Sequence, residues 1–265
     1  MDLSSSSHEG IVALSKQLNA IPRNNMSEAI GKLAQSPKIS MANLLVIFKF
    51  LSIFGKSDEF FLNFKEHISS EKQKLNLATH HKQGKNALLL DIGYSANKGH
   101  HEDYNHSIAS ELKKRKYEVN LGISFMNRIS QNLHDITDNY YGFLSRAYHS
   151  EFRQFSISQI QSMNDAYFLD LEINLGTYVP ELLICHSVNE LQIAGLGKWL
   201  NTKSKSKDIK VYIGLMDMGT SQDEKRNTDI YEFVENSFKT IENISHCTIH
   251  LGTQNEFFQT EFEKR

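Results

Sequence analysis

From Asn86 onwards, short apolar runs alternate with amphipathic stretches, and this alternation constrains the fold more than any other feature of the sequence. The run at 87–92 (ALLLDI) is followed by a polar loop, by a stretch with apolar residues at helical spacing, and by an alternating run at 117–125. Strand, loop, helix and strand in this order predict a βαβ unit, with parallel strands and a right-handed crossover.

The same alternation continues toward the C-terminus. We expect further strands and helices, in chain order a strand at 165–171, a strand at 181–185, a helix at 191–200, a strand at 209–215, a helix at 228–241 and a strand at 244–251. Ser187 and Glu190 have the S-x-x-E spacing of a capping box ahead of the helix at 191–200. Five or six strands alternating with helices predict an α/β protein with a doubly wound parallel sheet.

The first part of the chain has a different pattern. We expect an α-helical N-terminal extension over residues 1–84 and the α/β domain over residues 85–265. Ser40 is expected to cap a helix that ends at the sequence GKSD, and the polar stretch 69–85 is expected to connect the two parts.

The longest apolar stretch, Ala42–Phe54, lies in this extension and contains Lys49. It is shorter than the roughly 20 apolar residues of a membrane-spanning helix, so it predicts a buried helix. The alternative is an interfacial helix whose phenylalanines enter a membrane surface while its lysines stay at the headgroups.

Composition excludes several classes of protein. Lys and Arg number 29 against 31 Asp and Glu, so the net charge of -2 argues against nucleic acid as a partner. The two cysteines, Cys185 and Cys247, are too few for a disulfide framework and predict buried free thiols in a reducing compartment. The polar first ten residues lack the features of a signal peptide. We therefore expect a cytoplasmic protein, with peripheral contact to the inner face of the membrane as the alternative.

In a doubly wound sheet, ligands bind at the carboxyl ends of the strands. This rule selects four segments, namely the loop with Gly93, Gly99, His100 and His101, then His186, then the turn with Asp217 and Gly219, and last Gly252-Thr253. The helix after the first loop favours an anion at its N-terminus, and the two adjacent histidines add donors that can become cationic. His186 is placed to act as a general base or to stabilise developing charge. Each segment also has an ordinary explanation as a polar turn or a hydrogen-bonded histidine.

Three other groups of residues are weaker candidates than these segments. Asp170 and Glu172 would share one face of the expected strand at 165–171 and resemble a metal-binding pair, but acids beside an apolar strand are common. The histidines and acids at 100–106 contain no H-E-x-x-H zinc motif. No G-x-S-x-G, G-x-G-x-x-G or P-loop motif follows a strand. The sequence therefore predicts neither a metal site nor a cofactor.

The segment 91–119, DIGYSANKGHHEDYNHSIASELKKRKYEV, resembles the opening of a GT-B glycosyltransferase of the large retaining family that includes bacterial polysaccharide and lipopolysaccharide transferases. The similarity covers about residues 86–260, and Lys116-Tyr117 stands where the family often has glycine. The matching residues are Gly99, His100, His101, Tyr104, Asn105, Ala109, Leu112 and Val119, followed by His186, Glu190, Leu191 and Gly195.

The resemblance implies one Rossmann-like domain, the N-terminal and acceptor-side half of a GT-B fold. It implies transfer of a sugar from a nucleotide-diphosphate donor to a carbohydrate or lipid-linked acceptor, with His186 near the transferred sugar and Gly99 and His100 by the acceptor or the donor phosphates. The leaving diphosphate would be stabilised by helix dipoles and cationic side chains without a metal. A GT-B enzyme has two such domains, so catalysis is expected to need a C-terminal domain or a partner subunit.

Two other functions stay open. The first is a non-catalytic interaction module, in which the Phe-rich face of residues 1–84 docks a partner protein or a membrane. The second is a Rossmann-like enzyme of another class that acts on a phosphorylated small molecule.

Overall fold

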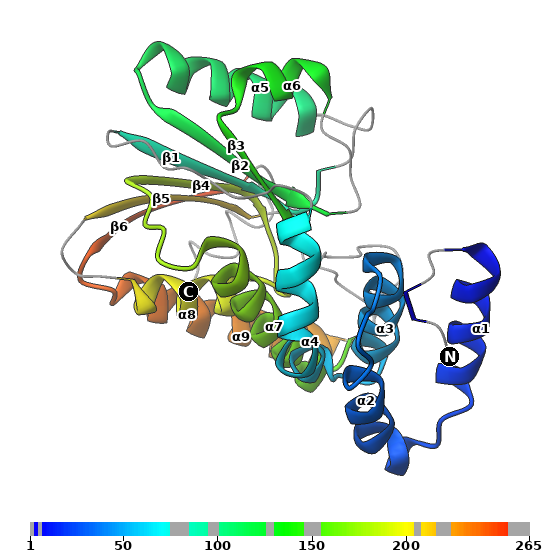
Figure 1. Ribbon diagram of the computed structural model, residues 1–265. Coiled ribbons are helices and arrows are strands. Elements are labelled where there is room, and N and C mark those ends of the chain that lie inside the picture. Colours follow the sequence, from blue (N-terminus) through cyan, green and yellow to red (C-terminus); the bar gives the residue numbers. More distant parts are fainter. Residues whose placement is uncertain are drawn as a thin grey trace.

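The computed structural model of the chain describes residues 3–4, 7–74, 85–94, 101–125, 130–145, 155–203, 208–215 and 224–253. This part contains a single parallel sheet of six strands in the order β3-β2-β1-β4-β5-β6, which confirms the predicted α/β fold (Figure 1). The strands are β1 (Asn86–Asp91), β2 (Glu118–Ser124), β3 (Asn139–Phe143), β4 (Leu182–Val188), β5 (Ile209–Leu215) and β6 (Cys247–Thr253).

The order of the strands reverses between β1 and β4. The chain builds outward from β1 to β3, crosses back to pair β4 with the free side of β1, and then builds outward to β6. Ala87 pairs with Leu182 and Leu89 pairs with Ile184 at this junction. The carboxyl ends of β1 and β4 therefore form the topological switch point of the sheet, which is where doubly wound folds bind their ligands.

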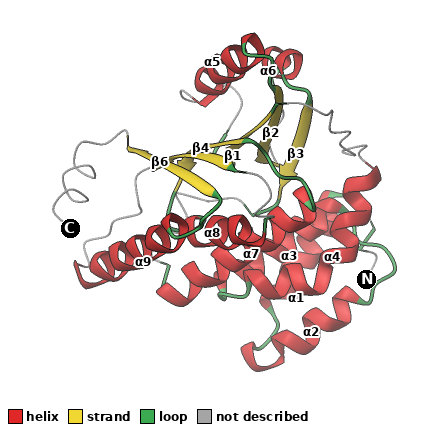
Figure 2. Ribbon diagram, turned by 90° about the vertical axis from the view of Figure 1, so that its left-hand side faces the viewer, coloured by secondary structure: helices red, strands yellow, loops and turns green. Residues whose placement is uncertain are grey.

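Helices cover both faces of the sheet, as Figures 1 and 2 show. Helices α5 (His101–Lys114) and α6 (Gln131–Ile136) pack on one face, with α7 (Ile157–Leu175), α8 (Ile193–Thr202) and α9 (Glu224–Glu242) on the other. In β1, Ala87 and Leu89 are buried in the hydrophobic core on the side of α5 and α6. Leu88 and Leu90 are buried in the core on the side of α7, α8 and α9. Burial on both faces explains why this strand is a continuous apolar run.

The N-terminal helices are α1 (His8–Asn19), α2 (Met26–Ala34), α3 (Met41–Ile53) and α4 (Ser57–Lys74), with a short 3-10 helix at Arg23–Asn25. The Ser40 side chain accepts a hydrogen bond from the amide of Asn43, which confirms the predicted cap of α3. Gly55, with a φ of 68°, lies between α3 and α4 in the left-handed region that glycine tolerates best.

Helices α3 and α4 pack against α7, and all four N-terminal helices share its hydrophobic core. Phe48, Phe60, Phe61 and Phe64 are buried in the same cluster as Tyr167 of α7. Polar contacts fix the junction, because the Ser162 hydroxyl accepts from the amide of Ser57 at 2.8 Å and donates to Asp58 at 2.8 Å. The Phe-rich face is therefore interior to this chain. No helix among the described residues is long and apolar enough to cross a membrane.

Several predicted elements differ from the structure. Residues 165–171 belong to helix α7 and not to a strand, because a capping box of Ser156 and Gln159 starts a helix whose apolar residues continue at helical spacing. The strand at 139–143 was not predicted. Helix α4 extends to Lys74, into the stretch expected to be a connection, and residues 75–84 lie outside the described part.

The expected capping box of Ser187 and Glu190 is also wrong. Ser187 lies inside β4, and α8 begins only at Ile193, with no side-chain cap at Gln192. The Ser187 hydroxyl is instead used at the end of β1, as described next.

Candidate functional site

A buried carboxylate marks the carboxyl end of β1. Asp91, the last residue of that strand, is 0 % exposed. Its Oδ2 accepts from Nδ2 of Asn105 at 2.7 Å and lies 3.0 Å from Nδ1 of His101, while its Oδ1 accepts from the Ser187 hydroxyl at 2.6 Å. Because His101 and Asn105 lie in the first turns of α5 and Ser187 in β4, one carboxylate joins the elements on both sides of the switch point.

His186 approaches the same carboxylate from β4. Its Nε2 lies 3.0 Å from Oδ1 of Asn105 and 3.5 Å from Oδ2 of Asp91. Since the Asn105 amide nitrogen donates to Asp91, its oxygen is the atom that accepts a hydrogen bond from Nε2 of His186. We refer to Asp91, His101, Asn105, His186 and Ser187 as the switch-point cluster.

The rim of the switch-point cluster is reachable from outside. The side chains of His101 and His186 are 14 % and 10 % exposed, and their ring centroids are 5.9 Å apart. Tyr104 stacks on His186 with centroids 5.8 Å apart and an interplanar angle of 27°, and it is 42 % exposed. The site therefore has a buried carboxylate, two imidazoles next to it and an aromatic ring at its edge.

Electrostatics hold the Asp91 side chain in its charged form. Burial by itself would raise its pKa, but the hydrogen bond from His101 and the positive charges of His186 and His101 outweigh burial, and the pKa lies below its ordinary value. The hydrogen bond to Asp91 raises the pKa of His101, against the opposing effect of burial. His101 is also the first residue of α5, so its imidazole lies beside the positive end of the helix dipole.

The structure brings together four of the side chains that the sequence singled out, namely His101, Tyr104, Asn105 and His186. Gly93 lies beside them, because a Cβ placed there would be 3.5 Å from Cε1 of His101 and 3.8 Å from Oγ of Ser187. The remaining predicted residues, Gly99, His100, Asp217 and Gly219, lie outside the described part of the chain.

Sequence reasoning missed Asp91 and Ser187 as site residues. An acid that directly ends a buried parallel strand was the available signal for Asp91, since an unpaired carboxylate is costly there. Ser187 was assigned to a helix cap because its true partner is 96 residues away along the chain.

Asp170 and Glu172 do not share one face as they would on a strand, because both lie on helix α7, where residues two positions apart point in different directions. Oδ2 of Asp170 accepts from the backbone amides of Leu144 and Ser145 at 2.6 and 2.8 Å. Glu172 binds Nζ of Lys203 at 2.9 Å. Asp170 therefore anchors the segment after β3, and the two acids have separate structural roles.

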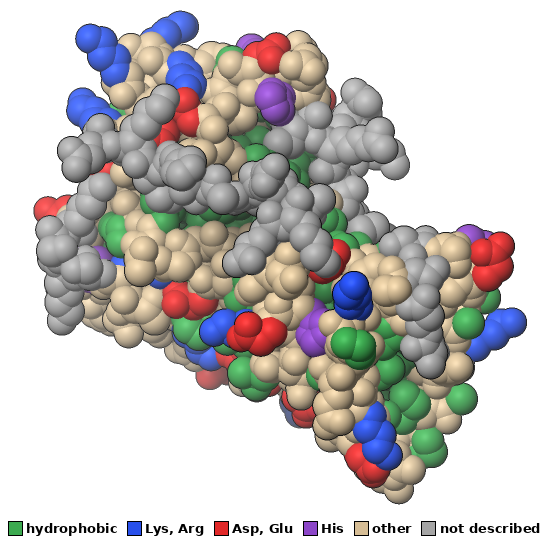
Figure 3. All heavy atoms as spheres, viewed as in Figure 1, with side chains coloured by type: hydrophobic (Ala, Val, Ile, Leu, Met, Phe, Trp, Pro, Cys, Tyr) green, Lys and Arg blue, Asp and Glu red, His purple; other side chains and the backbone are tan. Residues whose placement is uncertain are grey.

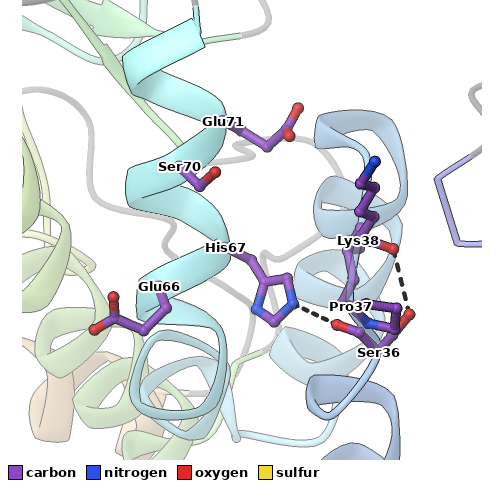
Figure 4. Close-up of a pocket in the computed structure, with 8 residues that line it drawn as sticks. Ser36, Pro37, Lys38, Glu66, His67, Ser70 and Glu71 are labelled. Carbon is purple, nitrogen blue, oxygen red and sulfur yellow. Dashed lines mark hydrogen bonds between the residues drawn. The ribbon is translucent and has the colours of Figure 1, made fainter.

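The rest of the described surface supplies weaker candidates. In the view of Figure 3, Lys and Arg side chains gather where α5 ends, away from the switch-point cluster, and they complement the negative end of that helix. A hollow of about 460 Å³ lies among the N-terminal helices. In it, Nε2 of His67 on α4 donates to the backbone oxygen of Ser36 at 2.8 Å, so this imidazole ties α4 to the segment after α2 (Figure 4).

Comparisons with protein-family models, with curated proteins and with solved structures give no match for this chain. Function is therefore inferred from the geometry and the chemistry of the switch-point cluster.

Proposed function

We propose that this chain is the N-terminal, acceptor-side half of a GT-B glycosyltransferase, and that the switch-point cluster binds its charged, sugar-bearing ligand. The reaction would transfer a sugar from a nucleotide-diphosphate donor to a carbohydrate or lipid-linked acceptor. One observation carries the proposal. Two imidazoles lie beside a buried, hydrogen-bonded carboxylate, and an exposed tyrosine stacks on one of them, at the point of the sheet where doubly wound folds bind ligands.

The chemistry of the cluster fits such a ligand. His101 lies at the N-terminus of α5, where backbone amides and the helix dipole favour a phosphate or another anion. Tyr104 presents an exposed ring beside His186, and an aromatic ring of this kind gives a sugar an apolar surface with a polar edge. The two features lie side by side, as a ligand with a phosphate and a sugar requires.

The roles of the side chains follow from their contacts. His186 is the candidate catalytic residue, since its ring lies at the rim and can hold or accept a proton near the transferred sugar. Asp91, Asn105 and Ser187 are positioning residues, because they act by fixing the two imidazoles. A second domain that closes over this edge of the sheet would exclude water and supply the remaining contacts.

The structure weakens the case for an interaction module that docks through its Phe-rich face. Phe60, Phe61 and Phe64 are 0 %, 1 % and 0 % exposed, and they pack within this chain. An enzyme of another class that acts on a phosphorylated small molecule would use the same cluster, so the identity of the ligand distinguishes it from a glycosyltransferase.

The test is to titrate the protein with UDP-sugars and GDP-sugars and to follow binding by calorimetry and by melting temperature. We expect a nucleotide sugar to bind and to raise the melting temperature, and H101Q and H186Q to weaken binding. H106A is the matched control, because His106 lies on α5 with an exposed side chain outside the cluster. Absence of binding at millimolar nucleotide sugar would contradict the proposal, and binding only of other phosphorylated molecules would favour the other enzyme class.

A further inference from the structure

Three side chains of the switch-point cluster have the spacing of metal ligands. A carboxylate oxygen of Asp91, a ring nitrogen of His101 and a ring nitrogen of His186 all lie within 4.8 Å of one another. Oδ2 of Asp91 is 3.0 Å from Nδ1 of His101 and 3.5 Å from Nε2 of His186. Two ligands of a tetrahedral zinc ion, each about 2.0–2.1 Å from the metal, lie about 3.3 Å apart. The two measured separations lie on either side of that value.

The donor atoms indicate which kind of ion would bind. Two imidazole nitrogens and one carboxylate suit zinc and related transition metals, whereas magnesium and calcium prefer oxygen ligands alone. Three protein ligands leave the fourth tetrahedral position open to water or to a substrate atom.

The surroundings of Asp91 resemble the outer shell of a metal centre. The Ser187 hydroxyl and the Asn105 amide donate to its carboxylate at 2.6 and 2.7 Å, and such contacts fix the direction in which a carboxylate presents its oxygens. The three ligands come from the end of β1, the start of α5 and the end of β4. These elements belong to the folded framework, so the ligands are brought together before any ion arrives.

We propose that Asp91, His101 and His186 bind one zinc ion, or a related divalent transition metal, at the switch point. On binding, Nδ1 of His101 and Nε2 of His186 would give their lone pairs to the ion, and each ring would carry its proton on the other nitrogen. Oδ1 of Asn105, 3.0 Å from Nε2 of His186, would then face the ion instead of a proton. Such a site departs from the metal-independent site that the glycosyltransferase resemblance implies.

The experiment is a calorimetric titration of the tag-free, metal-stripped protein with zinc chloride, with no nucleotide present. We expect one saturable zinc site per chain. H101A and H186A should each weaken binding at least tenfold, and S187A should weaken it about 10- to 100-fold through the outer shell. H106A is the control, since it removes an exposed imidazole of α5 and should leave the site unchanged. The chain has 12 histidines, and this control separates weak surface binding from the cluster.

Two results would overturn the inference, either no saturable site at micromolar free zinc, or wild-type affinity in both H101A and H186A. Circular dichroism checks that each variant folds. If either does not, the cobalt(II) spectrum of the wild-type protein decides, because intense visible bands indicate a tetrahedral protein site and weak bands indicate an aquo-like ion. Zinc binding and nucleotide-sugar binding are measured separately, so failure of one leaves the other standing.

Discussion

Nε2 of His186 lies 3.0 Å from Oδ1 of Asn105, which precedes it by 81 residues, and this contact joins the end of β4 to α5. Asn105 in turn donates a hydrogen bond to Asp91, and Asp91 accepts another from Ser187, the neighbour of His186 in β4. These hydrogen bonds form a continuous network across the switch point. The two imidazoles are therefore held in place by the fold before a ligand binds.

Replacing Asp91 with asparagine should disrupt this hydrogen-bond network. Three donors point at the carboxylate, and an amide would turn its own NH2 group toward one of them. We expect D91N to lower the free energy of unfolding by about 2–4 kcal/mol, measured by urea denaturation. It should also abolish ligand binding at the cluster.

The matched control for this variant is D170N. Asp170 is a second buried carboxylate, with four donors, namely the backbone amides of Leu144 and Ser145, the Ser145 hydroxyl and the Asn174 side-chain amide, but it lies outside the switch-point cluster. D170N should therefore lower the free energy of unfolding but leave ligand binding at the switch-point cluster unchanged. A D91N protein as stable as the wild type would show that the carboxylate does not hold the cluster together.

The sequence predicted most of the framework, because β1 is a buried apolar run and β2, β4 and β5 have apolar or alternating patterns that do not depend on distant residues. It failed at β3, a short strand at the edge of the sheet, and at residues 165–171, where the pattern of a buried helix resembles that of a buried strand.

The candidate site was predictable only in part. His101 and His186 follow from the rule that ligands lie at the carboxyl ends of strands. The partnership of Asp91 with Ser187 depends on the register between β1 and β4, and no local pattern carries that information.

Gly195 tests the close packing of α7 against α8. A Cβ at this position would lie 2.2 Å from the backbone oxygen of Asn164, and backbone atoms cannot move aside as a flexible side chain can. G195A should therefore lower the free energy of unfolding by about 3 kcal/mol, measured by urea denaturation.

Gly31 in α2 provides the opposite case, since apart from its chain neighbours and the backbone of its own helix no atom lies within 4 Å of the added methyl group. Alanine is the better helix former, so G31A should raise the free energy of unfolding by about 0.5–1 kcal/mol. Equal stabilities of G195A and G31A would contradict the described contact between α7 and α8.

The two cysteines should differ in reactivity. Burial raises the pKa of the Cys185 thiol far above its usual range, while burial and the charge of Asp208 raise the pKa of Cys247 to about 11. Only the thiolate reacts with iodoacetamide, so Cys247 of the native protein should react slowly, with a rate that rises about tenfold per pH unit below its pKa. Cys185 should react only after unfolding. Mass spectrometry of the modified peptides measures both, and equal labelling in the native state would contradict the burial of Cys185.

Nuclear magnetic resonance of histidine ring signals tests most directly whether the switch-point cluster is the binding site. H101Q, H106A and H186Q assign the three relevant signals in protein with labelled histidine. On titration with the nucleotide sugar that binds, we predict that the signals of His101 and His186 shift in proportion to saturation while that of His106 stays in place. Saturation of the protein with no change at His101 and His186 would place the ligand elsewhere and contradict the account.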